Sequence, residues 1–131
     1  MKAILVTGSR DWVDRTVIHD QMMAHYERGV HHVLIHGDCR GVDRIAGIIA
    51  SEYRWSVLPM AARWELEGRL AGPKRNTRMV EVLKYLRDCG YWCKVLGFPL
   101  PGSNGTWHMI NIARCNDFDV WVYGEKRYEV V

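Results

Sequence analysis

The length, composition and charge of the chain limit its class. Its 131 residues are enough for one domain with a buried core and too few for two. About half of them are hydrophobic (48%) and 25% are charged, which is typical of a globular protein. The net charge of +3, with acidic and basic residues mixed along the chain, is too small to indicate a nucleic-acid-binding surface. No apolar run is long enough to span a bilayer and the N-terminus does not form a signal peptide, so we expect a soluble cytoplasmic protein without membrane contacts.

The four cysteines do not form a metal-binding pattern. Cys89 and Cys93 have three residues between them, whereas zinc and redox motifs have two, and no second pair of this kind occurs. Cys39 and Cys115 are isolated. We therefore expect free thiols, no metal site and no cofactor.

The first half of the chain alternates short apolar runs with helical patterns. Residues 3–7 are almost continuously apolar and precede a glycine, which predicts a strand buried on both faces. Apolar residues then recur at helical spacing over about 13–28, and a second strand follows at 32–36. The clearest helix is expected over 42–53, where the apolar residues form one continuous stripe.

The second half continues the same alternation. A third strand is expected at 56–60, followed by a charged loop at 63–69. A helix is expected to begin near Pro73, since proline suits a first helical turn, and to end before Gly90. The remaining expected elements are a fourth strand at 93–98, a turn-rich loop at 99–105, a helix around 109–113 and a last strand at 118–123.

This order of strands and helices predicts an α/β protein. We expect a Rossmann-like, three-layer α/β/α sandwich around a mainly parallel five-stranded sheet, formed as a single domain by residues 1–131. The tail at 124–131 is expected to pack on the sheet edge or on a second subunit.

Four loops that follow predicted strands combine glycine with polar or basic side chains. They cover residues 8–11, 36–43, 72–76 and 101–106. In a parallel sheet all strands end at one edge, where ligands bind. Glycine lets the backbone approach an anion, and the start of a helix presents free N–H groups and a positive dipole end. The loops therefore predict a site for a phosphorylated nucleotide or nucleotide derivative.

The candidate site residues come from these loops. Asp43 and Arg75 are the candidate catalytic residues, the first as a general acid or base and the second as a ligand of phosphate. The candidates for binding the nucleotide and its phosphate are Gly8, Ser9, Arg10, His36, Gly37, Asp38, Gly41, Asn76, Gly102, Ser103, Asn104, Gly105, Thr106 and Trp107. Arg75 and Asn76, at the start of a predicted helix, are alternatively helix caps.

Other candidates also have structural alternatives. Arg10 either binds phosphate or pairs with Asp11 on the surface. Thr106 either contributes to an anion site or caps the helix that follows it. Asp43 either contacts ribose or complements a helix dipole, and His36 is either functional or a buried structural histidine. Three tryptophans near the loops either stack on a base or belong to the core: Trp12, Trp64 and Trp107.

Three segments together resemble a known superfamily. They are residues 8–12 (Gly-Ser-Arg-Asp-Trp), 36–43 (His-Gly-Asp-Cys-Arg-Gly-Val-Asp) and 71–79 (Ala-Gly-Pro-Lys-Arg-Asn-Thr-Arg-Met). From Lys2 to about Tyr123, the chain resembles small bacterial and phage members of the SLOG superfamily, which groups the Lonely Guy phosphoribohydrolases with the DNA-processing Smf proteins. The nearest branch is the YspA-like, YpsA-related group.

The resemblance implies a Rossmann-like nucleotide-binding fold and self-association, since relatives commonly form homodimers or larger homo-oligomers. Lonely Guy enzymes hydrolyse the N-glycosidic bond of nucleoside monophosphates, and other members are thought to sense nucleotide derivatives. Arg75 and Met79 match the Lonely Guy helix motif, and residues 101–106 match its Pro-Gly-Gly-x-Gly-Thr loop. The sequence departs from that motif at Met109, which stands where Lonely Guy enzymes have a catalytic glutamate. Asp43 and Glu67 are the alternative carboxylates.

Three functions follow from these observations. The first is hydrolysis of the N-glycosidic bond of a nucleotide or related phosphoribosyl compound. The second is a catalytically silent module that captures or senses such a ligand, which accounts for the missing glutamate. The third, DNA binding, is disfavoured by the small net charge.

Overall fold

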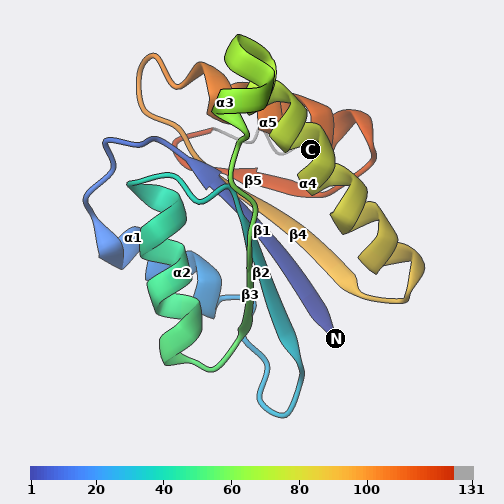
Figure 1. Cartoon of the computed structure of the whole chain (residues 1–131). Helices are drawn as coiled ribbons and strands as arrows, with labels where there is room; N and C mark the ends of the chain where they lie inside the picture. The colour runs from blue at the N-terminus through green and yellow to red at the C-terminus, as the bar shows by residue number, and fades with distance from the viewer. Residues whose placement is uncertain (126–131) are drawn as a thin grey trace, which may run out of the picture.

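The computed structural model, which describes residues 1–125, has a twisted parallel sheet with helices on both faces (Figure 1). Its strands are β1 (Lys2–Gly8), β2 (His32–His36), β3 (Ser56–Pro59), β4 (Trp92–Phe98) and β5 (Val120–Val122). They lie in the order β3-β2-β1-β4-β5, and all four pairings are parallel. The α/β fold with a five-stranded sheet, expected from the sequence, is confirmed.

The helices divide between the two faces of the sheet. Helix α1 (Arg15–Met23) and helix α2 (Val42–Glu52) cover one face, and α4 (Ala71–Asp88) and α5 (Asn104–Cys115) cover the other. A short helix, α3 (Trp64–Glu67), and the 3₁₀ turn η1 (Gly68–Leu70) lie between β3 and α4. The layers are those of an α/β/α sandwich.

Strand β1 shows why the sheet is buried on both sides. Ala3 and Leu5 pack in the core under α4 and α5, whereas Ile4 and Val6 pack in the core under α1 and α2. All four side chains are fully buried. Successive side chains of a strand point to opposite faces, so a central strand needs an apolar residue at every position.

The structure differs from the sequence-based expectation in three places. Residues 63–69, expected as a loop, include helix α3 and most of η1. Helix α1 is shorter than the expected 13–28: the Asp14 side chain accepts a hydrogen bond from the amide of Thr16 and starts it, and no residue from 24 to 30 is buried. The last strand spans only Val120–Val122. Of the tail at 124–131, positions 126–131 lie outside the described residues.

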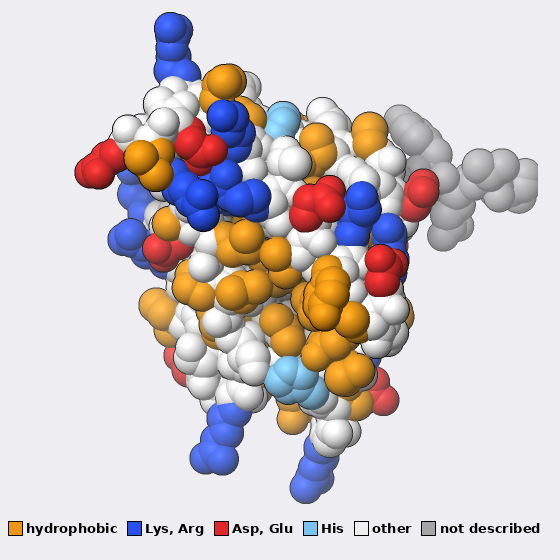
Figure 2. All heavy atoms as spheres, turned by 45° about the vertical axis from the view of Figure 1, so that its right-hand side comes forward, with side chains coloured by type: hydrophobic (Ala, Val, Ile, Leu, Met, Phe, Trp, Pro, Cys, Tyr) orange, Lys and Arg blue, Asp and Glu red, His pale blue; other side chains and the backbone are white. Residues whose placement is uncertain are grey.

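The sheet face under α4 and α5 is only partly covered. These helices pack against β1 and β4, while Leu58 on β3 is 39% exposed and Val33 on β2 is half-buried. Figure 2, which views the molecule from the α4 side, shows hydrophobic side chains gathered below a group of lysines and arginines. Self-association, expected from the sequence, stays a prediction. Within residues 1–125 no helix has the length and apolarity to cross a bilayer.

Gly41 allows the loop after β1 to contact the start of α2. Its φ is +77°, and a Cβ there would lie 2.3 Å from the carbonyl oxygen of Ser9 and 2.7 Å from the carbonyl carbon of Arg10. The amide of Val42 donates a hydrogen bond to the same Ser9 oxygen (3.2 Å). Only glycine combines this conformation with this close approach. The contact fixes two of the glycine-containing loops side by side at the sheet edge.

Replacing Gly41 by alanine tests this constraint. We expect Gly41→Ala to lower the free energy of unfolding by about 3 kcal/mol, because it adds a steric clash with backbone to the strain of a positive φ. The matched control is Gly29→Ala. Gly29 has a φ of +80°, and nothing lies within 4 Å of the position that a Cβ would take. Backbone strain alone therefore lowers the free energy of unfolding of this variant, by about 1 kcal/mol. Urea denaturation measures both, and equal losses would contradict the close contact.

Candidate functional site

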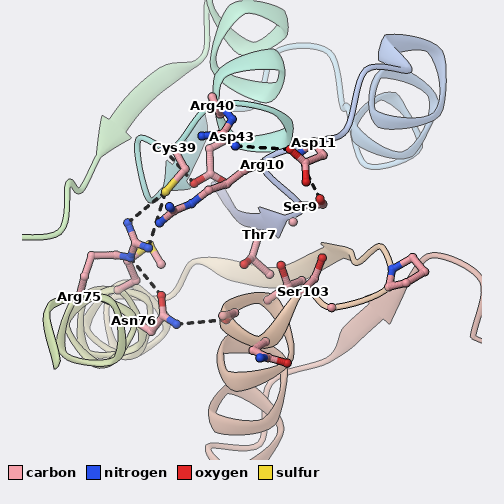
Figure 3. Close-up of a pocket in the computed structure, with 17 residues that line it drawn as sticks. Thr7, Ser9, Arg10, Asp11, Cys39, Arg40, Asp43, Arg75, Asn76 and Ser103 are labelled. Atoms are coloured by element: carbon pink, nitrogen blue, oxygen red, sulfur yellow. Dashed lines mark hydrogen bonds and ion pairs between the residues drawn. The ribbon is translucent and has the colours of Figure 1, made fainter. Parts of the chain in front are cut away.

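A cleft of about 330 Å³ opens where the strand order reverses. Strands β1 and β4 are neighbours, but the chain leads from β1 towards β2 and from β4 towards β5, on opposite sides. Ligands of parallel α/β sheets bind at such switch points. All four glycine-containing loops contribute to the lining, together with Thr7 of β1 and Met79 of α4. The lining residues are Thr7, Gly8, Ser9, Arg10, Asp11, Cys39, Arg40, Asp43, Arg75, Asn76, Met79, Pro101, Gly102, Ser103, Asn104, Gly105 and Thr106 (Figure 3).

Most residues predicted for the site line this cleft, including Arg10, Asp43, Arg75 and Thr106. The exceptions are His36, Gly37, Asp38, Gly41 and Trp107. Sequence reasoning left out six lining residues: Thr7, Asp11, Cys39, Arg40, Met79 and Pro101. Most of these residues lie within the four loops, and Met79 follows Arg75 by one helical turn. Their place in the sequence was therefore the only signal that could have identified them as lining residues.

The predicted residues outside the lining have other surroundings. His36 and Asp38 line a second hollow beside α2 and β3. The ring of His36 is buried, and its Nδ1 accepts a hydrogen bond from the amide of Asp38 (2.9 Å). Burial lowers the pKa of His36, so the ring is neutral at pH 7. These contacts favour the alternative that His36 is a buried structural histidine. Trp107, on α5, is 40% exposed.

The backbone of Gly37 connects three elements behind the cleft. Its N–H donates to Oδ2 of Asp43 on α2 (3.1 Å), and its carbonyl oxygen accepts a hydrogen bond from Nη1 of Arg75 on α4. A Cβ on Gly37 would lie 2.4 Å from that guanidinium nitrogen. The backbone after β2 is therefore held from both sides by the two residues predicted to be catalytic.

Arg75 carries a buried positive charge that no carboxylate neutralises directly. Besides Gly37, its hydrogen-bond partners within residues 1–125 are neutral: Oδ1 of Asn76 (3.0 Å), the carbonyl of Met60 (3.4 Å) and the sulfur of Cys39 (3.8 Å). The side chain is only 7% exposed, and it lies in the second turn of α4, which excludes the capping role. A buried guanidinium with neutral partners favours an anion in the adjoining cleft.

Asp43 has one carboxylate oxygen without a partner. Oδ2 accepts from the amides of Gly37 (3.1 Å) and Cys39 (3.3 Å), whereas Oδ1 is buried and forms no hydrogen bond within the described residues. Burial raises the pKa of Asp43 to about 6, against the opposing effects of those two amides and of the Arg75 charge. The carboxyl group can therefore hold or release a proton near neutral pH.

The start of α5 faces the cleft without a side-chain cap. Ser103 occupies the N-cap position, but its Oγ accepts a hydrogen bond from the amide of Leu100 (3.0 Å) and none from the helix. Gly105 and Thr106 lie within the first turn, and their N–H groups have no backbone partner among the described residues, whereas the amide of Asn104 donates to the carbonyl of Gly102 (2.9 Å). Thr106 is therefore not the N-cap of α5, which was the alternative to its role in an anion site. Uncapped amides beside a positive dipole end suit a phosphate.

Arg10 and Arg40 supply further positive charge at the cleft. Figure 3 shows the side chain of Arg10 extending from the end of β1 towards Cys39 and Arg75. The sequence allowed a pair between Arg10 and Asp11, but the structure does not form it. Instead, Oδ1 of Asp11 lies 3.4 Å from Nη2 of Arg40. The Arg10 guanidinium instead lies over the ring of Trp64, 5.8 Å from its centroid.

Comparisons with known proteins agree with this fold. The family model of the YspA, cpYpsA-related SLOG family (YAcAr) matches residues 2–66. The Gene 61 protein of Mycobacterium phage D29 is 36% identical over 132 residues, which cover 96% of this chain and 99% of that protein.

Two crystal structures of the C-terminal domain of PF1911 hydrogenase from Pyrococcus furiosus resemble the chain in fold. They have TM-scores of 0.50 and 0.51 at 14% and 10% sequence identity. The first comparison covers 92% of this chain and 90% of the other, and the second covers 93% and 91%.

The raised pKa of Asp43 predicts how stability depends on pH. Between its ordinary value of 3.8 and about 6, the folded protein holds a proton on Asp43 that the unfolded chain releases. The contribution to stability is therefore complete below pH ~4 and is lost as the pH rises through ~6, with a total of about 3 kcal/mol. We expect Asp43→Asn to lack this dependence. Urea denaturation of both proteins from pH ~4 to pH ~7 measures it; parallel curves would contradict the shift.

Proposed function

The chain belongs to the YspA, cpYpsA-related SLOG family, and from this we propose that its cleft binds a nucleotide or a nucleotide-derived phosphoribosyl compound. The observation that carries the proposal is the convergence of four loops on one cleft that is lined by three arginines and a single buried carboxyl group. A ligand with an anionic group and sugar hydroxyls matches both features.

The phosphate is assigned to the part of the cleft between α5 and Arg75. The amides of Gly105 and Thr106 offer donors fixed by the helix, and Ser9 and Thr7 add hydroxyl groups in the lining. Arg75 contributes charge from a fixed position, since its guanidinium is tied to Gly37 and Asn76. A cleft built in this way favours phosphate over a neutral sugar.

The sugar is assigned to Asp43. Its free Oδ1 is a buried acceptor, and an unsatisfied buried oxygen is unfavourable unless a ligand or water supplies a donor. A ribose hydroxyl supplies that donor. The two amide hydrogen bonds on Oδ2 hold the carboxyl group in place for it.

Hydrolysis of the N-glycosidic bond is a second candidate function, favoured by the protonation behaviour of Asp43. Met109, at the position of the Lonely Guy glutamate, is fully buried in the core under α5, so the position contributes nothing to the cleft. Glu67, the other alternative carboxylate, does not line the cleft and binds Arg78. In this reaction Asp43 would donate a proton to the departing base or accept one from water.

Calorimetric titration with adenosine monophosphate tests binding. We expect Arg10→Ala and Arg40→Ala each to weaken binding about tenfold, since each removes one charged contact to the ligand. Neither side chain is buried, so the fold should be unaffected. Arg54→Ala is the control: it removes the same charge from an exposed position just after α2, outside the cleft. Equal weakening by all three variants would indicate a general charge effect and contradict the assignment.

Chromatography of the products tests hydrolysis. We expect incubation with a panel of nucleoside monophosphates, NAD and ADP-ribose to release free base if the cleft is catalytic, and Asp43→Asn to reduce the rate at least ~100-fold, because amide nitrogen cannot transfer the proton. Binding by both proteins without release of base would leave the chain as a capture or sensing module.

A further inference from the structure

The lining of the cleft lacks a flat apolar surface for a base. Among the described residues that line it, none is aromatic. A nucleobase is bound in proteins by stacking on aromatic or guanidinium planes as well as by hydrogen bonds. If the cleft holds phosphate and ribose, the base must lie against a group at its rim.

Two of the three tryptophans near the loops are unsuited to this task. Trp12 is 7% exposed, and its ring packs edge-on against Phe98 (centroids 5.5 Å apart) and Tyr123 (5.0 Å). Neither Trp107 nor Trp64 lines the cleft itself, and among the described residues the exposed ring of Trp107 has no cation–π contact with a lining residue. Trp64 is 50% exposed and contacts a lining residue, Arg10.

Trp64 lies over the start of the helix that forms one wall of the cleft. Its ring edge packs on Gly72, 3.5 Å from where a Cβ would stand on that glycine. Arg75, one turn later on α4, faces the cleft. The Arg10 guanidinium, which lines the cleft, lies 5.8 Å from the centroid of the indole ring, so the two planar groups adjoin at the rim.

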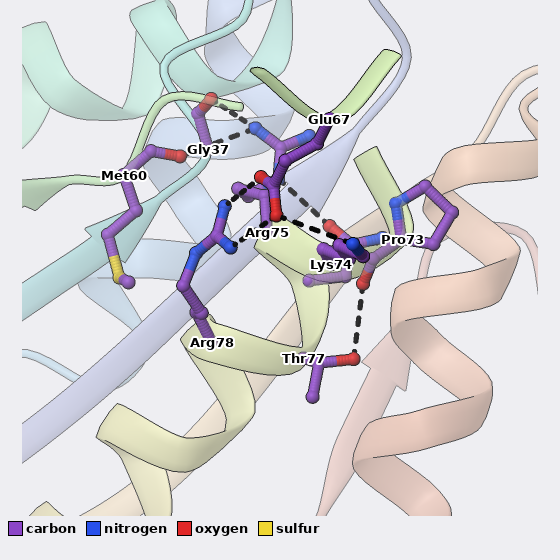
Figure 4. Close-up of polar contacts among 9 residues, drawn as sticks. Gly37, Met60, Glu67, Pro73, Lys74, Arg75, Thr77 and Arg78 are labelled. Carbon is purple, nitrogen blue, oxygen red and sulfur yellow. Dashed lines mark hydrogen bonds and ion pairs between the residues drawn. The ribbon is translucent and has the colours of Figure 1, made fainter. Parts of the chain in front are cut away.

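A salt-bridge cluster fixes the position of Trp64. Helix α3 begins at Trp64 and ends at Glu67, whose carboxylate lies 3.0 and 3.2 Å from two nitrogens of Arg78 and 3.9 Å from Nζ of Lys74 (Figure 4). The hydrogen bonds from Arg78 hold the pKa of Glu67 below its ordinary value, so the carboxylate stays charged at neutral pH. Both basic residues belong to α4, and the cluster ties α3 to it.

We propose that Trp64, together with the guanidinium of Arg10, forms the stacking surface that binds the nucleobase. This inference rests on the proposed function, since it assumes a nucleotide whose phosphate lies at α5 and whose ribose lies at Asp43. It assigns base binding to a segment outside the four glycine-containing loops. Stacking on an indole and a guanidinium plane tolerates every base, because every base has a π-face, so purine and pyrimidine nucleotides both bind, the larger purines more tightly.

The test compares a ligand with a base and a ligand without one. Calorimetry measures the binding of adenosine monophosphate and of ribose 5-phosphate to the wild-type chain, Trp64→Ala and Trp64→Phe. We expect Trp64→Ala to weaken adenosine monophosphate about tenfold and to leave ribose 5-phosphate unchanged, with most of the affinity kept in Trp64→Phe. Trp107→Ala is the matched control, because it removes an exposed indole from α5. Circular dichroism confirms that each variant is folded.

Each other outcome has a definite meaning. Unchanged binding of adenosine monophosphate by Trp64→Ala overturns the base assignment while the proposed function stands. Equal weakening of both ligands also overturns it, because Trp64 would then only support Arg10 at the phosphate. If the wild-type chain binds neither ligand, the proposed function fails and the base assignment falls with it.

Discussion

The site depends on the way the backbone of one glycine is held. Gly37 lies between the carboxyl group of Asp43 and the guanidinium of Arg75, and donates to one and accepts from the other. Both side chains are buried, where hydrogen bonds to charged groups contribute most. Strand β2, helix α2 and helix α4 therefore meet at one point. A change in any one of the three elements would displace the groups that face the cleft.

This arrangement also explains the unequal hydrogen bonding of Asp43. Oδ2 is engaged by backbone amides and is needed for the loop, while Oδ1 has no partner within the described part of the chain. One carboxyl group thus has one oxygen bound by backbone amides and one buried oxygen left unsatisfied within residues 1–125. Sites of this kind are less stable than a fully satisfied core, and such local instability is common where a ligand binds.

The sequence predicted the fold better than the details of the site. The apolar run of β1 and the stripe of α2 are strong patterns, because each reflects burial against many neighbours. The segment from Trp64 to Leu70 lacks such a pattern, since none of its side chains is buried, and its helix was missed. The positions of Arg75 and Asp43 at the cleft followed from topology, because parallel strands end at one edge. The hydrogen-bond partners of these side chains could not be predicted in this way, because Gly37 and Met60 bind through backbone atoms that every residue has.

The orientation of Ser103 has a consequence for the whole molecule. A serine at the N-cap commonly accepts a hydrogen bond from the first turn of its helix, but here that hydroxyl group accepts one from the amide of Leu100. On the proposed function, an oxygen of the bound anion takes the role of the absent cap, so helix formation and ligand occupancy become thermodynamically linked. Helix α5 packs directly on β1 and β4. A molecule that enters the cleft would thereby strengthen the centre of the sheet as well as its edge.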